Sequence, residues 1–571
     1  MNERPDRNTR NRTSIVPATM IAMSVQLMIA GCGKQLFPDD RPWQMPRSAL
    51  EVIEGSDLQQ SAELREAPSE DAIAMVLDGA VDFAEYPERT RLSLAEVRVS
   101  ALENNLELRA TILDPAIAEA GFEAESARFE STFVASVNQN ESNQQITNQD
   151  QSAQSSSTSV NLGLEVPLQT GGTLSFSTPF SRNTQDSQFA VAEFDAYWSA
   201  GVRFSVAQPL LRDAGIRVNT APIRVASYRS QIAQAQAKLA ATRILGNAEK
   251  AYWRLYAAWQ ELEVRKQQYE LAVEQMERAR RLVDAAQAAE IEVIRSESGV
   301  GSSLEAIIRA DAAIRRAQRE LKKIMNRSDL PLDSPTALEP SSVPNPVGLD
   351  IDAAAMARDA VDNRMEVLEL DLQLAIDASD IEVARNATLP DIAIRYDFGL
   401  NGNQPGSLAN TYESAFRGFY DTWSLGLSAS IPIGNEQAEA RLRQTILQRI
   451  QRLATRDQRV QAIRLEVYDV VDSINETWQR ILAARLETVL AGRTYEAEKR
   501  QFGLGLRTSN DVLDASARLA DARSREILAV VEYQAALIDA AFATGTIFGS
   551  GRIEWVDDES PAGGRFEDLG S

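Results

Sequence analysis

The chain has 571 residues, one cysteine, no histidine and a formal net charge of −23. This charge disfavours nucleic acid as a partner, because phosphate binding requires clustered Lys and Arg. The lack of histidine excludes imidazole bases and His-ligated metals, and one cysteine excludes an intramolecular disulfide and a thiolate cluster. Because the acidic residues are scattered over predicted helices, we expect no enzyme activity, no cofactor and no metal site.

The first 31 residues have the pattern of a secretory signal peptide. Four arginines among residues 4–12 precede an uncharged, mostly apolar run at 15–30. This run is too short and too interrupted for a confident membrane span, which needs about 20 apolar residues. It ends on Ala30-Gly31-Cys32, which resembles the lipobox of bacterial lipoproteins. That resemblance implies a covalent lipid on Cys32; the alternative is an ordinary signal peptide with an incidental cysteine.

An acidic, Pro-interrupted stretch, residues 32–91, is predicted to be a lipidated N-terminal extension. A first structural repeat follows at 92–325 and begins with a helical pattern. The period then changes to two within 131–208, which predicts half-buried strands. The alternating segments are 132–140, 159–166, 173–180 and 199–206.

A very long helix is predicted at 222–298. Its apolar residues recur three and four positions apart, which is the heptad pattern of coiled-coil packing. At 1.5 Å per residue such a helix would span about 110 Å, more than a compact domain needs. The sequence Gly299-Val300-Gly301 is predicted to end it, and a shorter helix is expected at 304–325. Residues 326–349 form a Pro-rich linker.

The same order of elements recurs in residues 350–545, which predicts an internal tandem duplication. Local echoes support it: ALENNLELRA at 101 resembles AVDNRMEVLE at 360, and WQEL at 259 resembles WQRI at 478. The elements expected after the opening helix of this second repeat are a β-hairpin at 391–432, a long helix at 436–502 and a helix at 510–542. An acidic tail is expected at 546–571.

In their order and spacing, three pieces resemble the TolC-type outer-membrane efflux family, in its lipoprotein, OprM-like branch. They are AQPLLRDAG at 207–215, ASIPIGNEQAEARLRQ at 429–444 and GLRTSNDVLDAS at 505–516. The resemblance covers roughly residues 90–545. It implies an α+β membrane protein, in which three chains close one outer-membrane β-barrel. A long periplasmic α-helical coiled-coil barrel continues it.

The resemblance also implies a function and partners. The homotrimer would be a passive conduit of a tripartite efflux or type I secretion-like system. It would receive substrates from an inner-membrane transporter of the RND, ABC or MFS type through a periplasmic adaptor protein, and would carry them across the outer-membrane lipid. The alternative is a periplasmic coiled-coil adaptor or structural lipoprotein. That alternative accounts for the helices and Cys32 but leaves the alternating strands unexplained.

The number of strands departs from the family pattern. The usual member contributes two strands from each half, twelve in the trimer, whereas four segments alternate in the first half of this chain. If all four join the wall, the trimer has eighteen strands. Otherwise residues 159–180 form a hairpin folded in a loop or in the lumen. The sequence leaves both arrangements open.

The resemblance places candidate site residues in the turns after the long helices, at the periplasmic aperture. The sequence N-D-V-L-D-A at 510–515 matches a family stretch whose two acids, here Asp511 and Asp514, ring the constriction. The alternative is simple helix capping, with Ser509 or Asn510 as the N-cap and Asp511 in the first helical turn. The matches for the gate's polar links are Arg507 and Glu305, the latter expected in the first turn. Phe502 stands where the family can carry a Tyr, and it cannot donate a hydrogen bond.

Overall fold

The computed structural model describes residues 88–143, 154–186, 197–405, 407–417 and 420–553. They belong to one compact unit that begins at Ala80. The predicted signal peptide at 1–31, Cys32 and nearly all of the predicted extension at 32–91 lie outside the described residues.

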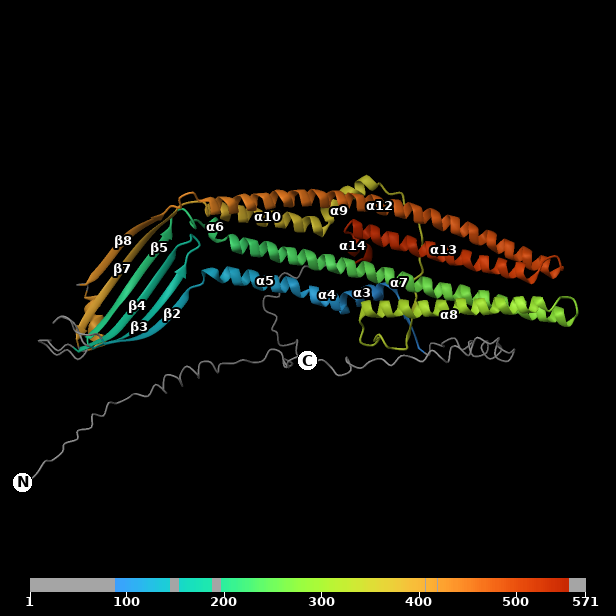
Figure 1. Cartoon of the computed structure of the whole chain (residues 1–571), viewed down its shortest axis with the longest axis horizontal. Helices are drawn as coiled ribbons and strands as arrows, with labels where there is room; N and C mark the ends of the chain where they lie inside the picture. The colour runs from blue at the N-terminus through green and yellow to red at the C-terminus, as the bar shows by residue number, and fades with distance from the viewer. Residues whose placement is uncertain (1–87, 144–153, 187–196, 406, 418–419, 554–571) are drawn as a thin grey trace, which may run out of the picture. The chain divides into compact units, whose positions relative to one another are not determined.

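A six-stranded antiparallel sheet, in the order β2-β3-β4-β5-β7-β8, occupies one end of this unit (Figure 1). Its strands are β2 (Thr132–Asn143), β3 (Gln154–Pro167), β4 (Thr173–Asp186), β5 (Tyr197–Pro209), β7 (Asp391–Pro405) and β8 (Asp421–Ser430). The predicted strands are therefore confirmed. The 159–180 hairpin lies between β2 and β5, so the arrangement that folds it into a loop or lumen is wrong.

Directly paired residues of neighbouring strands lie on the same face of a sheet. The pairing therefore gives this sheet one apolar face and one polar face. The apolar face carries Phe133, Val137, Val160, Leu164, Phe176, Phe180, Val202, Phe204, Phe398, Leu400, Trp423 and Leu425. The polar face carries Ser136, Asn138, Ser159, Asn161, Ser175, Ser177, Ser199, Arg203, Ser205, Asp397 and Ser424. This alternation is the pattern of a sheet that separates two different environments.

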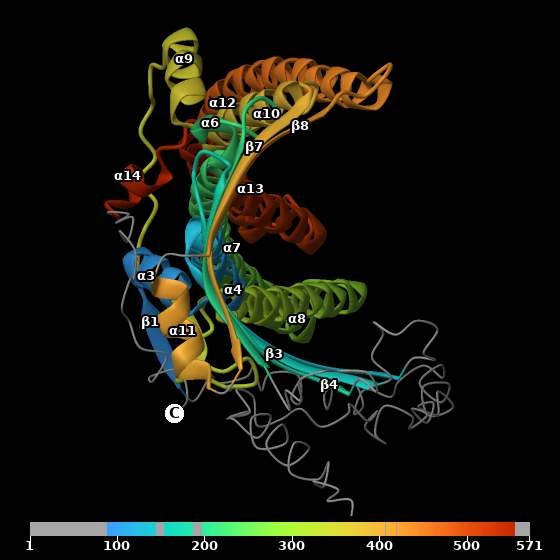
Figure 2. The same cartoon turned by 90° about the vertical axis from the view of Figure 1, so that its left-hand side faces the viewer.

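Helix α11 (Leu408–Phe416) lies against the apolar face. Gly402 permits this approach, because a Cβ there would collide with the Thr411 backbone oxygen. The hydroxyl groups of Thr178 and Tyr412 are hydrogen-bonded at 2.6 Å. Figure 2 shows the sheet curving with α11 on its convex side. The apolar face is therefore convex, and the polar face is concave.

Two long helical hairpins make up the other end of the unit (Figure 1). The first pairs α7 (Ala221–Asp284) with α8 (Ile291–Met325), and the second pairs α12 (Glu436–Gly503) with α13 (Ser509–Ala543). The remaining elements are β1 (Arg89–Leu92), α3 (Leu94–Asn104), α4 (Leu106–Thr111), α5 (Leu113–Ser126), η4 (Ala127–Phe129), α6 (Ile216–Asn219), β6 (Ala337–Pro340), α9 (Ala353–Asn363), α10 (Met365–Asn386) and α14 (Ile547–Gly551). Among the described residues, no helix is both long and apolar enough to cross a membrane.

The predicted end of the first long helix is wrong. The helix stops at Asp284 rather than 298, and α8 begins at Ile291 rather than 304. Gly299 and Gly301 lie inside α8, because a mid-helix glycine costs only about 1 kcal/mol relative to alanine. Gly299 instead provides close packing, since a Cβ at this position would lie 2.9 Å from Leu513 Cδ1. The second long helix and its partner match the predicted bounds to within one residue.

A hydrophobic core follows α7 and joins it to α8, α3 and α13. Its largest fully buried side chains include Tyr252, Leu245, Leu255, Ile307 and Ile314. A second cluster, around Ile463 and Val467, packs α12 against α9. Tyr533 and Ile474 centre a third cluster between α12 and α13. These clusters hold the two hairpins side by side and so fix the position of their tips.

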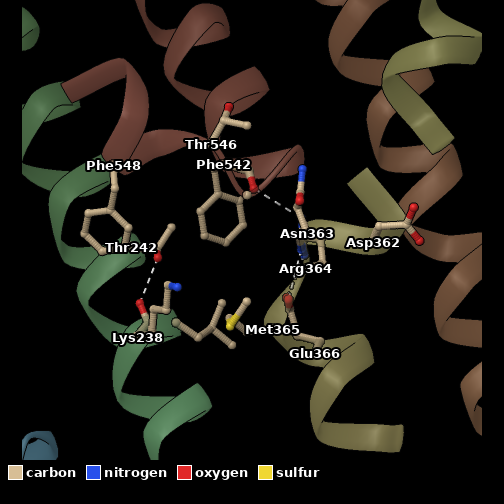
Figure 3. Close-up of a pocket in the computed structure, with 12 residues that line it drawn as sticks. Lys238, Thr242, Asp362, Asn363, Arg364, Met365, Glu366, Phe542, Thr546 and Phe548 are labelled. Atoms are coloured by element: carbon tan, nitrogen blue, oxygen red, sulfur yellow. Dashed lines mark hydrogen bonds and ion pairs between the residues drawn. The ribbon is translucent and has the colours of Figure 1, made fainter. Parts of the chain in front are cut away.

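A buried ionic cluster ties the start of α10 to the end of α13 (Figure 3). The Arg364 guanidinium donates to both carboxylate oxygens of Glu366, at 2.6 and 2.9 Å, and lies 3.2 Å from Glu466. It also donates to the Ala543 backbone oxygen and stacks over the Phe542 ring. Burial alone would raise the pKa of Glu366, but the hydrogen bonds and charge of Arg364 lower it. Beside this cluster lies an open cavity of about 310 Å³.

Candidate functional site

The two hairpins end in turns of the same geometry. Residues 285–290 join α7 to α8, and residues 504–508 join α12 to α13. Ala286 and Gly505 have left-handed backbones, with φ of 57° and 73°. The next N–H, of Gln287 or Leu506, donates to Leu282 or Gln501 respectively, at 2.8 and 3.0 Å. These are the backbone bonds that close a helix on a left-handed residue.

Equivalent positions in the two tips are 219 residues apart. Ala286 is equivalent to Gly505, and Glu292 is equivalent to Asp511. Both acids lie in the first turn of the returning helix, where a negative charge is favoured by the helix dipole. The predicted carboxylate Asp511 therefore has a counterpart, Glu292, in the first hairpin. Sequence reasoning missed it because the first turn had been placed too late in the chain.

Asp511 forms a capping box with Thr508. The Thr508 backbone N–H and hydroxyl both donate to Asp511 Oδ2 at 2.9 Å, and the Asp511 N–H donates to Thr508 Oγ1. The capping interpretation of this acid is thus correct in the single chain, although the cap is Thr508 rather than Ser509 or Asn510. Asp514 is exposed one turn further along, while its neighbours Val512 and Ala515 are buried.

The structure does not bring Arg507 and Glu305 together within one chain. Arg507 Nε donates to Gln501 Oε1 at 3.1 Å and lies 3.2 Å from Glu498 Oε2, both in its own hairpin. Glu305 lies in the body of α8, away from the turn, and pairs with Arg309 at 3.1 Å. Its expected position at the first turn is therefore corrected, and the cause is the misplaced helix end described above.

Other side chains link the two hairpins near the tips. The Arg278 guanidinium of α7 stacks over the Phe502 ring of α12, 5.4 Å from its centroid. Lys499 lies 3.5 Å from Glu274. Phe502 therefore joins the hairpins through a cation–π contact rather than through a hydrogen bond.

A buried polar cluster lies beneath these contacts. The Ser509 hydroxyl is hydrogen-bonded to Ser296 Oγ at 2.9 Å and accepts from Gln275 Nε2 at 3.2 Å. The Ser509 backbone N–H donates to Glu292 Oε2 at 3.3 Å. Small polar side chains thus connect α7, α8 and α13. Sequence reasoning missed Ser296 and Gln275, since they follow no motif and are recognisable only once the helices are packed.

The hairpin tips carry both acidic and basic side chains, since Glu292 pairs with Arg295 at 2.9 Å and the charge of Arg507 acts on Asp511. Three carboxylates, Glu292, Asp511 and Asp514, lie at or near the first turns of the two returning helices. Among the residues that the structure describes, no group of three or more Cys, Asp or Glu side chains is placed to hold a metal ion. The carboxylates can attract cations, and within the described part of the chain the tips pair no nucleophile with a base.

One family model matches the second repeat. Residues 356–546 match the family model described as "Outer membrane efflux protein". This part of the chain is therefore similar to outer membrane efflux proteins. The matched range begins in α9 and ends directly after α13, so it includes β7, β8 and the tip with Asp511. No curated protein matches this chain in sequence.

Solved channel structures share the fold of the whole described chain. OprN is 17% identical, with a TM-score of 0.60, and the match covers 79% of this chain and 90% of OprN. The Campylobacter jejuni outer membrane channel CmeC is 15% identical, with a TM-score of 0.60 and coverage of 80% and 86%. The open state of Neisseria gonorrhoeae MtrE is 18% identical, with a TM-score of 0.57 and coverage of 80% and 89%.

The capping box makes the second hairpin tip sensitive to acid. The bonds from the Thr508 N–H and hydroxyl lower the pKa of Asp511 below its usual 3.8. Because the folded pKa is the lower one, the cap stabilises the tip above pH 3.8 and is lost as pH falls through the folded value. We expect the protection factors for amide hydrogen exchange at residues 504–511, which correct for the intrinsic pH dependence of exchange, to be unchanged between pH 7 and 5. Asp511→Ala should lower these protection factors throughout that range, and equal protection in both proteins would contradict this cap.

Proposed function

We propose that three copies of this chain close a single conduit across the outer membrane and the periplasm. The observation that carries the proposal is the six-stranded sheet with one apolar face and two edges, β2 and β8, that have no strand partner among the described residues. An open edge cannot face lipid, because its backbone groups would stay unsatisfied. Since the six strands alternate in direction, β8 of one copy runs antiparallel to β2 of the next.

The order of the helices supports the same closure. Next to the sheet, α5 packs on α7, α7 on α10 and α10 on α12. A next copy would continue this series by placing its α5 beside α12. Nearer the tips, α8, α7, α13 and α12 pack in sequence, and the α8 of a next copy would continue that layer. In both layers the last helix on one side is α12. The last helix on the other side is α5 next to the sheet and α8 nearer the tips.

Both lateral helices expose apolar side chains. Within its described residues α5 buries none of its side chains, and α12 buries few in its first half. The exposed apolar residues on and beside these helices are Ile112, Leu113, Ile117, Leu447, Ile450, Leu453 and Leu465. Apolar surface of this extent on heptad-patterned helices favours burial against another copy.

In this proposal the channel is passive and is supplied from the inner membrane. Helix α12 has 68 residues and would reach about 100 Å from the sheet. Its tip would receive substrates from an inner-membrane transporter of the RND, ABC or MFS type through a periplasmic adaptor, as in tripartite efflux or type I secretion-like systems. The acids Asp511, Asp514 and Glu292 would line the entrance.

We also propose that Cys32 carries a lipid that anchors the N-terminus in the outer membrane. Small residues precede this cysteine, and Gly33 follows it. Metabolic labelling with radioactive palmitate tests the anchor: wild type should incorporate label, and Cys32→Ala behind a cleavable signal should not. Equal labelling of both proteins would overturn it.

Cross-linking tests the trimer. A cysteine at Val137 in β2 is combined with a cysteine scanned along β8 from Trp423 to Ala429, and outer-membrane fractions are oxidised. Neighbouring edges should give covalent ladders that stop at three chains, and unoxidised samples should contain SDS-resistant trimers. The matched control combines the Val137 cysteine with one at Val202, in the middle of the sheet, and should give no covalent ladder once its SDS-resistant trimers are dissociated by heating. A carbonate-extractable monomer would overturn the proposal.

A further inference from the structure

The β3–β4 hairpin is built into the wall of the sheet along its whole length. Strand β3 pairs with β2 from Gln154 to Glu165 and with β4 from Gln154 to Pro167. The turn at 168–172 is closed by its own backbone bonds, at 2.8 and 2.9 Å. It is also fastened to the base of the sheet, because the Gly215 N–H donates to the Thr170 backbone oxygen at 3.0 Å.

Side-chain bonds strengthen this attachment. Thr170 Oγ1 donates to Gln208 Oε1 at 2.8 Å, and Gln208 Nε2 donates to the Thr170 backbone oxygen at 3.1 Å. Gly171 has a φ of 90° and packs so closely on the Asp213 backbone oxygen that a Cβ would collide with it. A hairpin fixed at its base and paired on both sides is a permanent part of the wall.

The concave face of the wall is lined by small polar side chains. One continuous row across five strands reads Asn138, Ser159, Ser181, Ser199 and Asn403. Nearer the helices, another row reads Thr132, Glu165, Ser175, Ser205, Asp397 and Ser424. In narrow barrels large side chains fill the interior. Most side chains on this face are serine, threonine or asparagine, which are too short to fill it, although Glu165 and Arg203 are longer.

We propose that the outer-membrane end of the conduit is an eighteen-stranded barrel with an open hydrophilic lumen, which admits bulky hydrophilic cargo of polymer size. This inference rests on the proposed trimer, since three copies of six strands are needed. With strands about 4.8 Å apart and tilted by about 40°, eighteen strands enclose a ring about 36 Å across between backbones. Twelve strands would enclose about 24 Å.

The chemistry of the lumen fits this class of cargo. Hydroxyl and amide side chains hydrogen-bond weakly to any polar surface and compete poorly with water. Glu165, Arg203 and Asp397 are charged residues of both signs on the concave face, and Ser205 donates to Asp397 at 2.7 Å. A large polar solute would therefore pass without a strong binding site, and width rather than charge would set the limit.

Accessibility of single cysteines to polymers of graded size tests the width. Ser175→Cys lies on the concave face near the base of the barrel, and Leu174→Cys is its matched control on the convex face. Intact cells are treated from outside with maleimide–poly(ethylene glycol) reagents, including coils between about 24 and 36 Å wide. We expect these coils to label Ser175→Cys at least tenfold more than Leu174→Cys.

Each alternative outcome decides a different point. Labelling of Ser175→Cys by small maleimides only, or equal labelling of both positions, would overturn the wide lumen while the trimer stands. A cross-section of the trimer in lipid nanodiscs should show eighteen wall strands, and twelve would overturn the inference. Loss of SDS-resistant trimers in wild type would instead refute the proposed function. Each cysteine variant is compared only after its own trimers are confirmed.

Discussion

Replacing Arg364 with alanine should lower the free energy of unfolding by about 3–5 kcal/mol, because removing one partner of a buried ion pair leaves the other charge buried and uncompensated. The guanidinium of Arg364 is only 4% exposed. Without Arg364, the Glu366 side chain, which is 10% exposed, would pair only with the partly exposed Arg459, at 2.9 Å. It would also free the last carbonyl groups of α13, which Arg364 now satisfies. Thermal unfolding followed by circular dichroism measures the change.

Two further variants separate burial from charge. Arg456→Ala removes an ion pair with Asp371 on the exposed side of the same helices, and it should cost less than about 1 kcal/mol. The double variant Arg364→Met with Glu366→Leu replaces the buried pair with apolar side chains, and it should recover part of the loss. If the variants Arg364→Ala and Arg456→Ala unfold at the same temperature, the buried cluster does not hold α10 to α13.

The contacts of Arg278 with Phe502 and of Lys499 with Glu274 join the two hairpins near the tips, and we call them the rim contacts. Removing both, in the variant Arg278→Ala with Lys499→Ala, should raise leak conductance by up to about tenfold. The cation–π contact to Phe502 and the ion pair to Glu274 are each worth about 0.5–1 kcal/mol at a partly exposed site. A shift of about 1.4 kcal/mol changes an open-to-closed ratio tenfold. Single-channel recording in planar bilayers measures the open fraction.

The matched control for this variant is Arg309→Ala. Arg309 pairs with Glu305 along the surface of α8, within its own hairpin. It should leave conductance unchanged. Unchanged conductance in the double variant as well, with intact SDS-resistant trimers, would show that the rim contacts do not keep the entrance closed. The buried Ser296–Ser509 cluster would then be the next contact to remove.

The local sequence pattern predicted an element correctly where one buried face of that element determines its structure. Alternation of side chains predicted the strands, and the heptad pattern predicted α12 almost to the residue, because each reports a single buried stripe. The end of α7 could not be predicted in this way. Its turn consists mainly of alanine and closes on Ala286, a residue with high helix propensity, while the two nearby glycines pack inside α8.

The candidate site shows the same limit. Asp511 was recognisable because a motif surrounds it, and its capping role follows from the sequence around Thr508. Glu292, Ser296 and Arg278 carry no such motif, and each gains its role from a residue more than 200 positions away. Glu305 was misplaced because the turn was misplaced.

The sequence by itself determined the duplicated plan of strands and long helices, the polar and apolar faces of the strands, and the resemblance to efflux channels. These depend on periodicity, which is local in the chain. Only the tertiary structure decided that all six strands form one wall, that the hairpin tips match at a spacing of 219 residues, and that Arg364 joins α10 to α13. Such contacts depend on which distant segments pack together, and many pairings satisfy the same local pattern.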